Sequence, residues 1–156
     1  MEYKYTLSSA TNYAGQGRLE EWVHGYLCSE GGNKPFSDGL KLFHRYYIGP
    51  TEMPVALFQR ICGPEENMPY RVNPEGFEKQ VGALTKLISG GADLPPLIVH
   101  YYVENGKEFF ELNDGNHRHE ALVRLGAISC QVIIWITEAH ELELFIKRYP
   151  HCLENF

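Results

Sequence analysis

The side chains best suited to chemistry gather in one short polar run. Residues 109–112 before it alternate like a strand, and residues 121–125 after it continue as a helix that a glycine ends. The run therefore lies at the first turn of a helix that follows a strand. Unpaired N–H groups and the positive end of the helix dipole meet there, which suits an anion such as a phosphate. The run consists of Asp114, Gly115, Asn116, His117 and Arg118.

Two side chains of this run would contact a phosphate. Arg118 would clamp phosphate oxygens, and the alternative is an ordinary surface ion pair. His117 would donate to a phosphate or to the group being transferred, and the alternative is an exposed histidine. His119 is expected on another side of the helix. Because histidines two positions apart on a helix point in different directions, we do not expect a zinc pair.

The other three residues of the run each have two interpretations. Asp114 would hold Mg²⁺ or act as a base beside the phosphates, or it is simply a turn or N-cap aspartate. Gly115 would let the backbone approach a ligand, or it is a plain turn glycine. Asn116 would offer its N–H group and side chain to the ligand, or it caps the helix.

An irregular loop over residues 62–71 supplies two further candidates. Glu65 is a candidate catalytic carboxylate, although a solvated loop charge explains it better. Arg71 is a candidate for reaching the same phosphates. Prolines and a glycine keep this loop irregular.

Composition limits the class of protein. The chain has 156 residues and a formal net charge of −6, which argues against broad, sequence-independent DNA binding without excluding a local phosphate site. The four cysteines form no CxxC pair, so they indicate neither a zinc knuckle nor a redox dithiol. With no signal peptide and no long apolar run, we expect a reduced, cytoplasmic protein that does not contact a membrane.

The second part of the chain alternates between helices and strands. A helix is expected from Asn73-Pro74 to Gly90-Gly91, and strands over 97–103 and 108–112 are joined by a hairpin at Asn105-Gly106. After the central helix we expect a buried strand over 130–136 and a last helix capped by Thr137. This order predicts an α/β or α+β fold with a small mixed sheet flanked by helices.

The N-terminal part is less regular. Helical spacing of apolar residues predicts a helix over 18–27, whereas 1–17 has weak periodicity and 33–50 is loop-like. Residues 40–48 suit a helix or a strand, and 54–61 a short strand or turn. No linker divides the chain, so we expect a single domain over 1–156, with an N-terminal extension over 1–50 and a core over 51–156.

The order of elements and the central turn together resemble the ParB N-terminal/sulfiredoxin superfamily. The similar features are the strand after Pro95-Pro96, the hairpin, the run over 112–126 with its early alanine and terminal glycine, and the strand over 132–136. The resemblance covers roughly the second two-thirds of the chain. It implies a nucleotide pocket with the phosphates near Gly115, Asn116, His117 and Arg118, and it does not explain the extension.

The chain departs from most branches of that superfamily. The chain resembles sulfiredoxins, but these carry a reactive cysteine at the position of Asn116. Because the chain has no thiol there, we do not expect it to repair sulfinic acids. ParB partition proteins have an arginine in place of His117 and a DNA-binding helix-turn-helix domain, which we do not expect in this acidic chain. The turn is most similar in form to that of the ParB-like free-serine kinases.

Two functions from different classes follow. The first is an enzyme, a phosphotransferase or nucleotide hydrolase that uses ATP, ADP or CTP with Mg²⁺ and a small-molecule acceptor. The catalytic residues would be Asp114, His117 and Glu65. The nucleotide would be bound by Gly115, Asn116, His117, Arg118 and Arg71, and Asp114 would hold the metal. The second is a non-catalytic, nucleotide-gated module whose extension contacts a protein or nucleic-acid partner.

Overall fold

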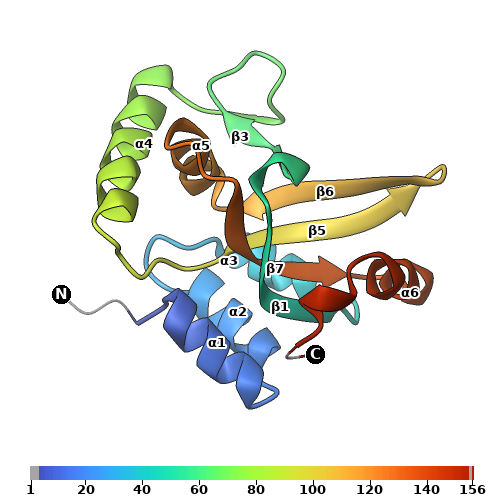
Figure 1. The fold of residues 1–156 in the computed structure, drawn as a ribbon. Coiled ribbons are helices and arrows are strands. Elements are labelled where there is room, and N and C mark those ends of the chain that lie inside the picture. The colour runs from blue at the N-terminus through green and yellow to red at the C-terminus, as the bar shows by residue number, and fades with distance from the viewer. Residues whose placement is uncertain (1–3, 155) are drawn as a thin grey trace.

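A five-stranded mixed sheet forms the centre of the computed structural model, which describes residues 4–154 and 156 (Figure 1). The strand order is β1-β7-β5-β6-β2, with the β5–β7 and β2–β6 pairs parallel and the other two pairs antiparallel. The expected fold class, a mixed sheet flanked by helices, is confirmed. The strands are β1 (Tyr46–Pro54), β2 (Gln59–Arg60), β5 (Leu97–Glu104), β6 (Lys107–Asp114) and β7 (Ser129–Ile136).

The β5–β6 hairpin forms where the sequence predicts it. Asn105 and Gly106 have φ angles of 53° and 77°, the left-handed conformations that a two-residue hairpin turn of this kind requires. Tyr102 then pairs with Phe109, and their stacked rings lie 5.0 Å apart. The register places alternate side chains of β6 on opposite faces of the sheet.

One face of the sheet is covered by α6 (Ala139–Arg148) and the short helix η2 (Pro150–Cys152). Phe145 of α6 packs against Tyr101 with ring centroids 5.1 Å apart. The expected N-cap, Thr137, is wrong: the helix is capped at Glu138, whose N–H group donates to Glu141 at 3.4 Å. Thr137 instead accepts a hydrogen bond from Arg45, so its hydroxyl is used in tertiary structure.

The other face is covered by three helices of the N-terminal region, α1 (Leu7–Gly15), α2 (Leu19–Leu27) and α3 (Lys34–Leu40). Their apolar side chains share one core with Ile98, Ile133 and Trp135 of the sheet. The prediction of α2 is confirmed. Helices α1 and α3 were not predicted, and the loop expected after Asn33 is wrong because Asn33 caps α3 and Pro35 is tolerated in its first turn.

The remaining elements surround the start of α5 (Asn116–Arg124). Helix α4 (Pro74–Ser89) begins as predicted, with Asn73 accepting a hydrogen bond from the Gly76 N–H group at 3.1 Å, and it packs on α5. The irregular loop contains a small parallel ribbon of β3 (Cys62–Gly63) and β4 (Tyr70–Arg71). The segment over 54–61 forms the short helix η1 (Val55–Leu57) and β2.

The expected division after residue 50 falls inside β1, because this strand runs from Tyr46 to Pro54. Residues 40–48, which suit either a helix or a strand, hold the end of α3 and the beginning of β1. Residues 1–3 of the expected domain lie outside the part that the structure describes. In the described residues, no helix is both long and apolar enough to cross a membrane.

Candidate functional site

A left-handed glycine joins β6 to α5. Gly115 has a φ angle of +95°, and a Cβ atom built on it would lie 2.4 Å from Leu97 Cδ2 and 2.9 Å from Arg118 Nη2. Both the backbone angle and the lack of space require glycine here. The close neighbours are atoms of the protein itself, so its own packing is enough to explain this glycine.

The first turn of α5 has free backbone donors. Its first intrahelical hydrogen bond runs from the His119 N–H group to the Gly115 carbonyl oxygen at 2.8 Å, and Gly115 has no side chain that could cap the helix. Within the described residues, the N–H groups of Asn116, His117 and Arg118 have no protein acceptor. Together with the helix dipole, these three groups form an anion-binding geometry.

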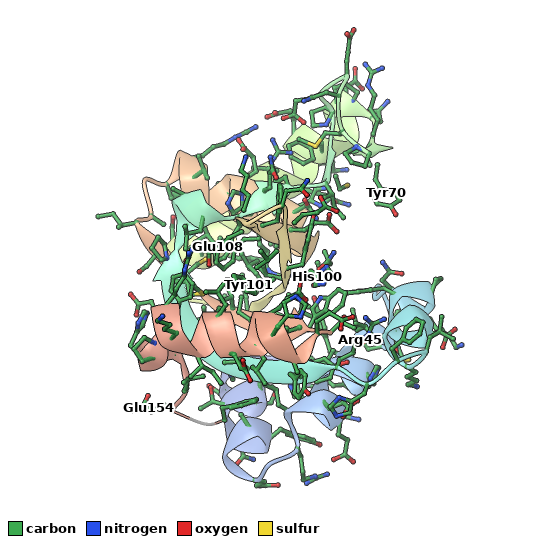
Figure 2. All side chains as sticks on the ribbon, turned by 90° about the vertical axis from the view of Figure 1, so that its right-hand side faces the viewer. Arg45, Tyr70, His100, Tyr101, Glu108 and Glu154 are labelled. Atoms are coloured by element: carbon green, nitrogen blue, oxygen red, sulfur yellow. The ribbon has the colours of Figure 1, made fainter. Side chains whose placement is uncertain are left out.

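This helix start opens into a cavity of about 780 Å³. Three segments that lie far apart in the sequence form its walls: the beginning of α3, the β3–β4 region and the β6–α5 turn. In Figure 2, Tyr70 lies above the labelled His100 of the central strand β5, and α3 lies below Tyr70 on the same side of the molecule. The lining residues are Asn33, Pro35, Phe36, Ile61, Cys62, Pro69, Tyr70, Glu111, Asn113, Asp114, Gly115, Asn116 and His117.

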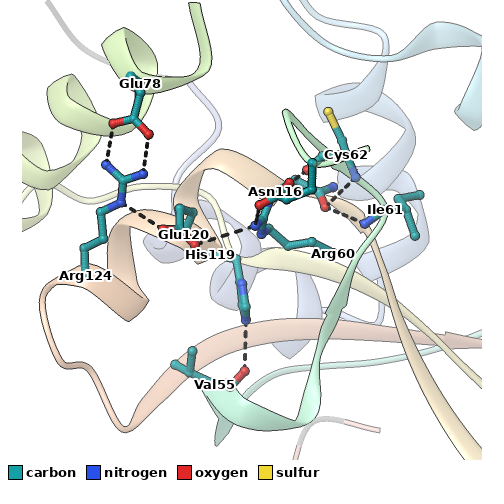
Figure 3. A network of polar contacts seen from close by, with 10 residues as sticks. Val55, Arg60, Ile61, Cys62, Glu78, Asn116, His119, Glu120 and Arg124 are labelled. Carbon is teal, nitrogen blue, oxygen red and sulfur yellow. Dashed lines mark hydrogen bonds and ion pairs between the residues drawn. The ribbon is translucent and has the colours of Figure 1, made fainter. Parts of the chain in front are cut away.

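The Asn116 side chain is already occupied by the protein. It is 6% exposed, and its Oδ1 atom accepts hydrogen bonds from the N–H groups of Ile61 at 2.9 Å and Cys62 at 3.2 Å (Figure 3). Its Nδ2 atom donates to the Leu112 carbonyl oxygen at 3.1 Å. The amide therefore holds the β3 segment against α5, which leaves the backbone N–H group of Asn116 to a ligand.

Arg118 turns away from this cavity and forms a partly buried ion pair. Its Nη2 atom donates to Asp114 Oδ2 at 3.2 Å and to the Pro96 carbonyl oxygen at 3.4 Å. The Tyr26 hydroxyl of α2 donates to the same Asp114 oxygen at 2.7 Å, and burial raises the pKa of Tyr26 to about 12. The guanidinium lines a second cavity behind the turn. The pair neutralises the Asp114 carboxylate and ties α2 to the turn.

His117 faces the main cavity and rests on Phe77, with ring centroids 4.9 Å apart. Burial, with the positive charges of Arg118 and Arg60, lowers the pKa of His117 below its usual value. The imidazole is therefore neutral at pH 7 and presents one donor and one acceptor nitrogen. His119 lies on another side of the helix, as expected, where Nε2 donates to the Val55 carbonyl oxygen at 2.9 Å (Figure 3).

The loop candidates lie beside the cavity and outside its lining. Glu65 forms an ion pair with Arg60, and the hydrogen bond from Arg60 lowers the pKa of this carboxyl. Arg60 also lies 3.7 Å from Glu120 of α5 (Figure 3). Arg71 is exposed, and its Nε atom donates to the Pro64 carbonyl oxygen at 3.2 Å. The structure thus places Glu65 in an ion pair with Arg60, and Arg71 in a hydrogen bond within its own loop.

The side chains present do not fit a metal cage built by the protein. Among the described residues, no group of three or more His, Cys, Asp or Glu side chains is placed to hold an ion. Asp114, the predicted metal ligand, already uses Oδ2 to accept from Tyr26 and Arg118. A magnesium role for Asp114 stays a prediction, and no step below depends on it.

The sequence did not indicate several residues that the fold brings to the site. Phe36 and Tyr70 line the cavity from segments that were read as loops, and Glu111 lines it from β6. Tyr26 belongs to a helix whose apolar stripe was predicted, but its bond to Asp114 spans 88 positions. The sequence around Tyr26 gives no indication that it contacts Asp114.

Comparisons with known proteins find several similar solved structures, among them a sulfiredoxin and a ParB, while no family model and no curated protein matches the chain. Sulfiredoxin from Arabidopsis thaliana is 22% identical over 62% of this chain and 94% of its own, with a TM-score of 0.42. The C-terminally truncated chromosome-partitioning protein ParB from Caulobacter crescentus, complexed with CTP-gamma-S, is 20% identical over 65% of this chain and 53% of its own, with a TM-score of 0.41. At these values the similarity says nothing about individual side chains.

Proposed function

We propose that this protein binds a nucleotide, with its phosphates at the start of α5. The observation that carries this is the set of N–H groups in the first turn of α5 that have no acceptor among the described residues, of which Asn116 and His117 line a cavity of about 780 Å³. Cavities of about 300–1,000 Å³ accommodate small molecules. A phosphate here would receive the backbone hydrogen bonds that the helix leaves unmade.

The charges around the turn support an anion. The Asp114 carboxylate would repel phosphate, but Arg118 neutralises it from the side away from the cavity. Burial is the main cause of the lowered pKa of His117, with smaller contributions from the charges of Arg118 and Arg60, and both arginines are themselves paired with carboxylates. The phosphate would therefore be held by the backbone N–H groups and the helix dipole.

Binding without catalysis is the form that these contacts support best. Asp114 and Glu65, the two predicted carboxylate catalysts, are both paired with arginines, so neither is a free base in this arrangement. Phosphotransfer to a small-molecule acceptor is the second candidate. One observation favours it: the neutral His117 imidazole lines the cavity, where it would accept the proton of an acceptor hydroxyl.

Calorimetric titration with ATP, ADP, CTP and inorganic tripolyphosphate, with and without Mg²⁺, tests the proposal. His117→Glu adds a negative charge at the second helical position, where a glutamate suits the helix dipole, so the helix is expected to form. We expect it to weaken binding about 10- to 100-fold by repelling phosphate. His117→Gln keeps a neutral side chain, and Gln80→Glu adds the same charge on an exposed position of α4.

Equal affinity in His117→Glu and in Gln80→Glu would overturn the phosphate position, and no binding of any probe at millimolar concentration would overturn the proposal. A second readout is the half-buried Cys62 thiol, which lines the cavity. In a Cys28→Ser background, which removes the exposed thiol, bound nucleotide should slow alkylation of Cys62. Phosphate release or transfer that His117→Gln abolishes while binding persists would establish the enzyme.

A further inference from the structure

The cavity has aromatic walls on two sides beyond the phosphate position. Pro35 and Phe36 of α3 form one wall, and Pro69 and Tyr70 of the β3–β4 region form another. Figure 2 shows Tyr70 on the opposite side of the open region from α3. A site for phosphate alone does not need such walls, since phosphate is recognised by hydrogen bonds and charge.

The two rings differ in how the protein supports them. Phe36 is partly buried and packs against Trp135 with ring centroids 6.0 Å apart, so its position is fixed. Tyr70 is 65% exposed, and in the described residues it has no aromatic neighbour. A flat ligand between the two would bury the Tyr70 ring, and stacking of this kind contributes about 1–3 kcal/mol per base.

Glu111 of β6 lines the same cavity and can select for a hydrogen-bond donor on the ligand. Its Oε1 atom accepts a hydrogen bond from Asn113 Nδ2 at 3.0 Å, while Asn113 Oδ1 accepts from Trp135 Nε1 at 2.9 Å. These bonds fix the orientation of the carboxylate. Among the described residues, no cation lies within ion-pair distance of Glu111. Glu111 can therefore accept a hydrogen bond from a neutral donor on the ligand.

We infer that the ligand is a nucleotide whose base carries an amino group, as adenine and cytosine do, with its ring between Phe36 and Tyr70 and its amino group donating to Glu111. This inference rests on the proposed nucleotide site and names the part of the nucleotide that the N-terminal helices recognise. Helix α3 then forms a wall of the binding site in addition to covering the sheet.

Matched ligands distinguish the affinity that comes from the base from the affinity that comes from the phosphates. Titrations compare ATP with ITP and CTP with UTP, since each pair exchanges an amino group for an oxygen, and use tripolyphosphate as the ligand without a base. Tyr70→Ala should weaken ATP or CTP binding about 5- to 100-fold and leave tripolyphosphate unchanged. Phe43→Ala is the matched control, because Phe43 is 67% exposed and does not line the cavity.

Glu111→Gln should reduce or reverse the preference for the amino-bearing base, because an amide offers a donor as well as an acceptor. Glu104→Gln, an exposed carboxylate at the end of β5, controls for the lost charge. Nucleotides that bind no tighter than tripolyphosphate would overturn the ring position while leaving the phosphate site standing. Equal affinities within both ligand pairs would overturn the role of Glu111. If tripolyphosphate and nucleotides all fail to bind, the proposed function falls as well.

Discussion

Asp114→Asn should lower the free energy of unfolding by about 2–3 kcal/mol. The change removes the charge that Arg118 and Tyr26 share, and it leaves the Arg118 guanidinium with neutral acceptors alone, the amide oxygen of the new side chain and the Pro96 carbonyl oxygen at 3.4 Å. The Nε atom of Arg118 is already buried and has no hydrogen-bond partner among the residues that the structure describes. Breaking a fully buried pair costs about 3–5 kcal/mol, and we reduce this because the two side chains are 15% and 19% exposed.

Urea unfolding of the parent and of Asp114→Asn measures this loss. For a chain of this size it corresponds to a fall in Tm of about 4–12 °C. A double-mutant cycle with Arg118→Met isolates the pair: the double variant should lose about 1–2 kcal/mol less than the sum of the single losses. Asp114→Asn therefore affects folding whether or not Asp114 takes part in chemistry.

Glu21→Gln is the control, because it breaks the exposed ion pair between Arg18 and Glu21 and should leave Tm unchanged. The reasoning would be refuted if Asp114→Asn were as stable as Glu21→Gln. Strictly additive losses in the cycle would refute the pairing of Asp114 with Arg118. Any test of catalysis by Asp114 has to be made at a temperature where the variant is folded.

Three further changes test other parts of the structure. Asn116→Ala removes three hydrogen bonds and should cost about 2–4 kcal/mol in urea unfolding, with faster proteolysis within residues 62–71. Burial lowers the pKa of His100 to about 4, so the unfolded chain takes up this proton first and stability falls as the pH drops from about 6.5 to 4. The loss should be about 2–3 kcal/mol, and His100→Phe should remove that part of the pH profile of unfolding. Gly115→Ala should lower the free energy of unfolding by about 2–4 kcal/mol and Gly91→Ala by about 1 kcal/mol, which thermal unfolding would show as a larger fall in Tm for the first variant. Both glycines have positive φ angles, but only Gly115 lacks space for a Cβ atom.

The sequence predicted elements whose signals are local. The hairpin at Asn105-Gly106 is encoded by the turn itself, and the start of α4 by the cap-and-proline pair at Asn73. Helix α1 was missed because its sequence, LSSATNYAG, has few apolar residues to reveal helical spacing, and α3 because its seven residues include Pro35 and Gly39, which are typical of a loop.

The position of the site could be predicted, but the directions of its side chains could not. A strand, a glycine and a helix were enough to indicate free N–H groups at the start of α5. Whether Arg118 faces the cavity depends on Asp114 and on Tyr26, a residue 88 positions away from Asp114. Likewise, Asn116 bonds to Ile61 across 55 positions. Such pairings are decided when the chain folds, and no local pattern in a single sequence records them.

The shared core of the N-terminal helices and the sheet has a consequence for synthesis on the ribosome. Trp22 of α2 leaves the ribosome early, but its core partners include Ile133 and Trp135 of β7, more than 100 residues later. Because translation adds about 5–20 residues per second, the apolar side chains of these helices stay exposed for about 5–20 s before β7 is synthesised. We therefore expect the nascent chain to need a chaperone during this interval, and slower translation of β7 to lower the yield of native protein.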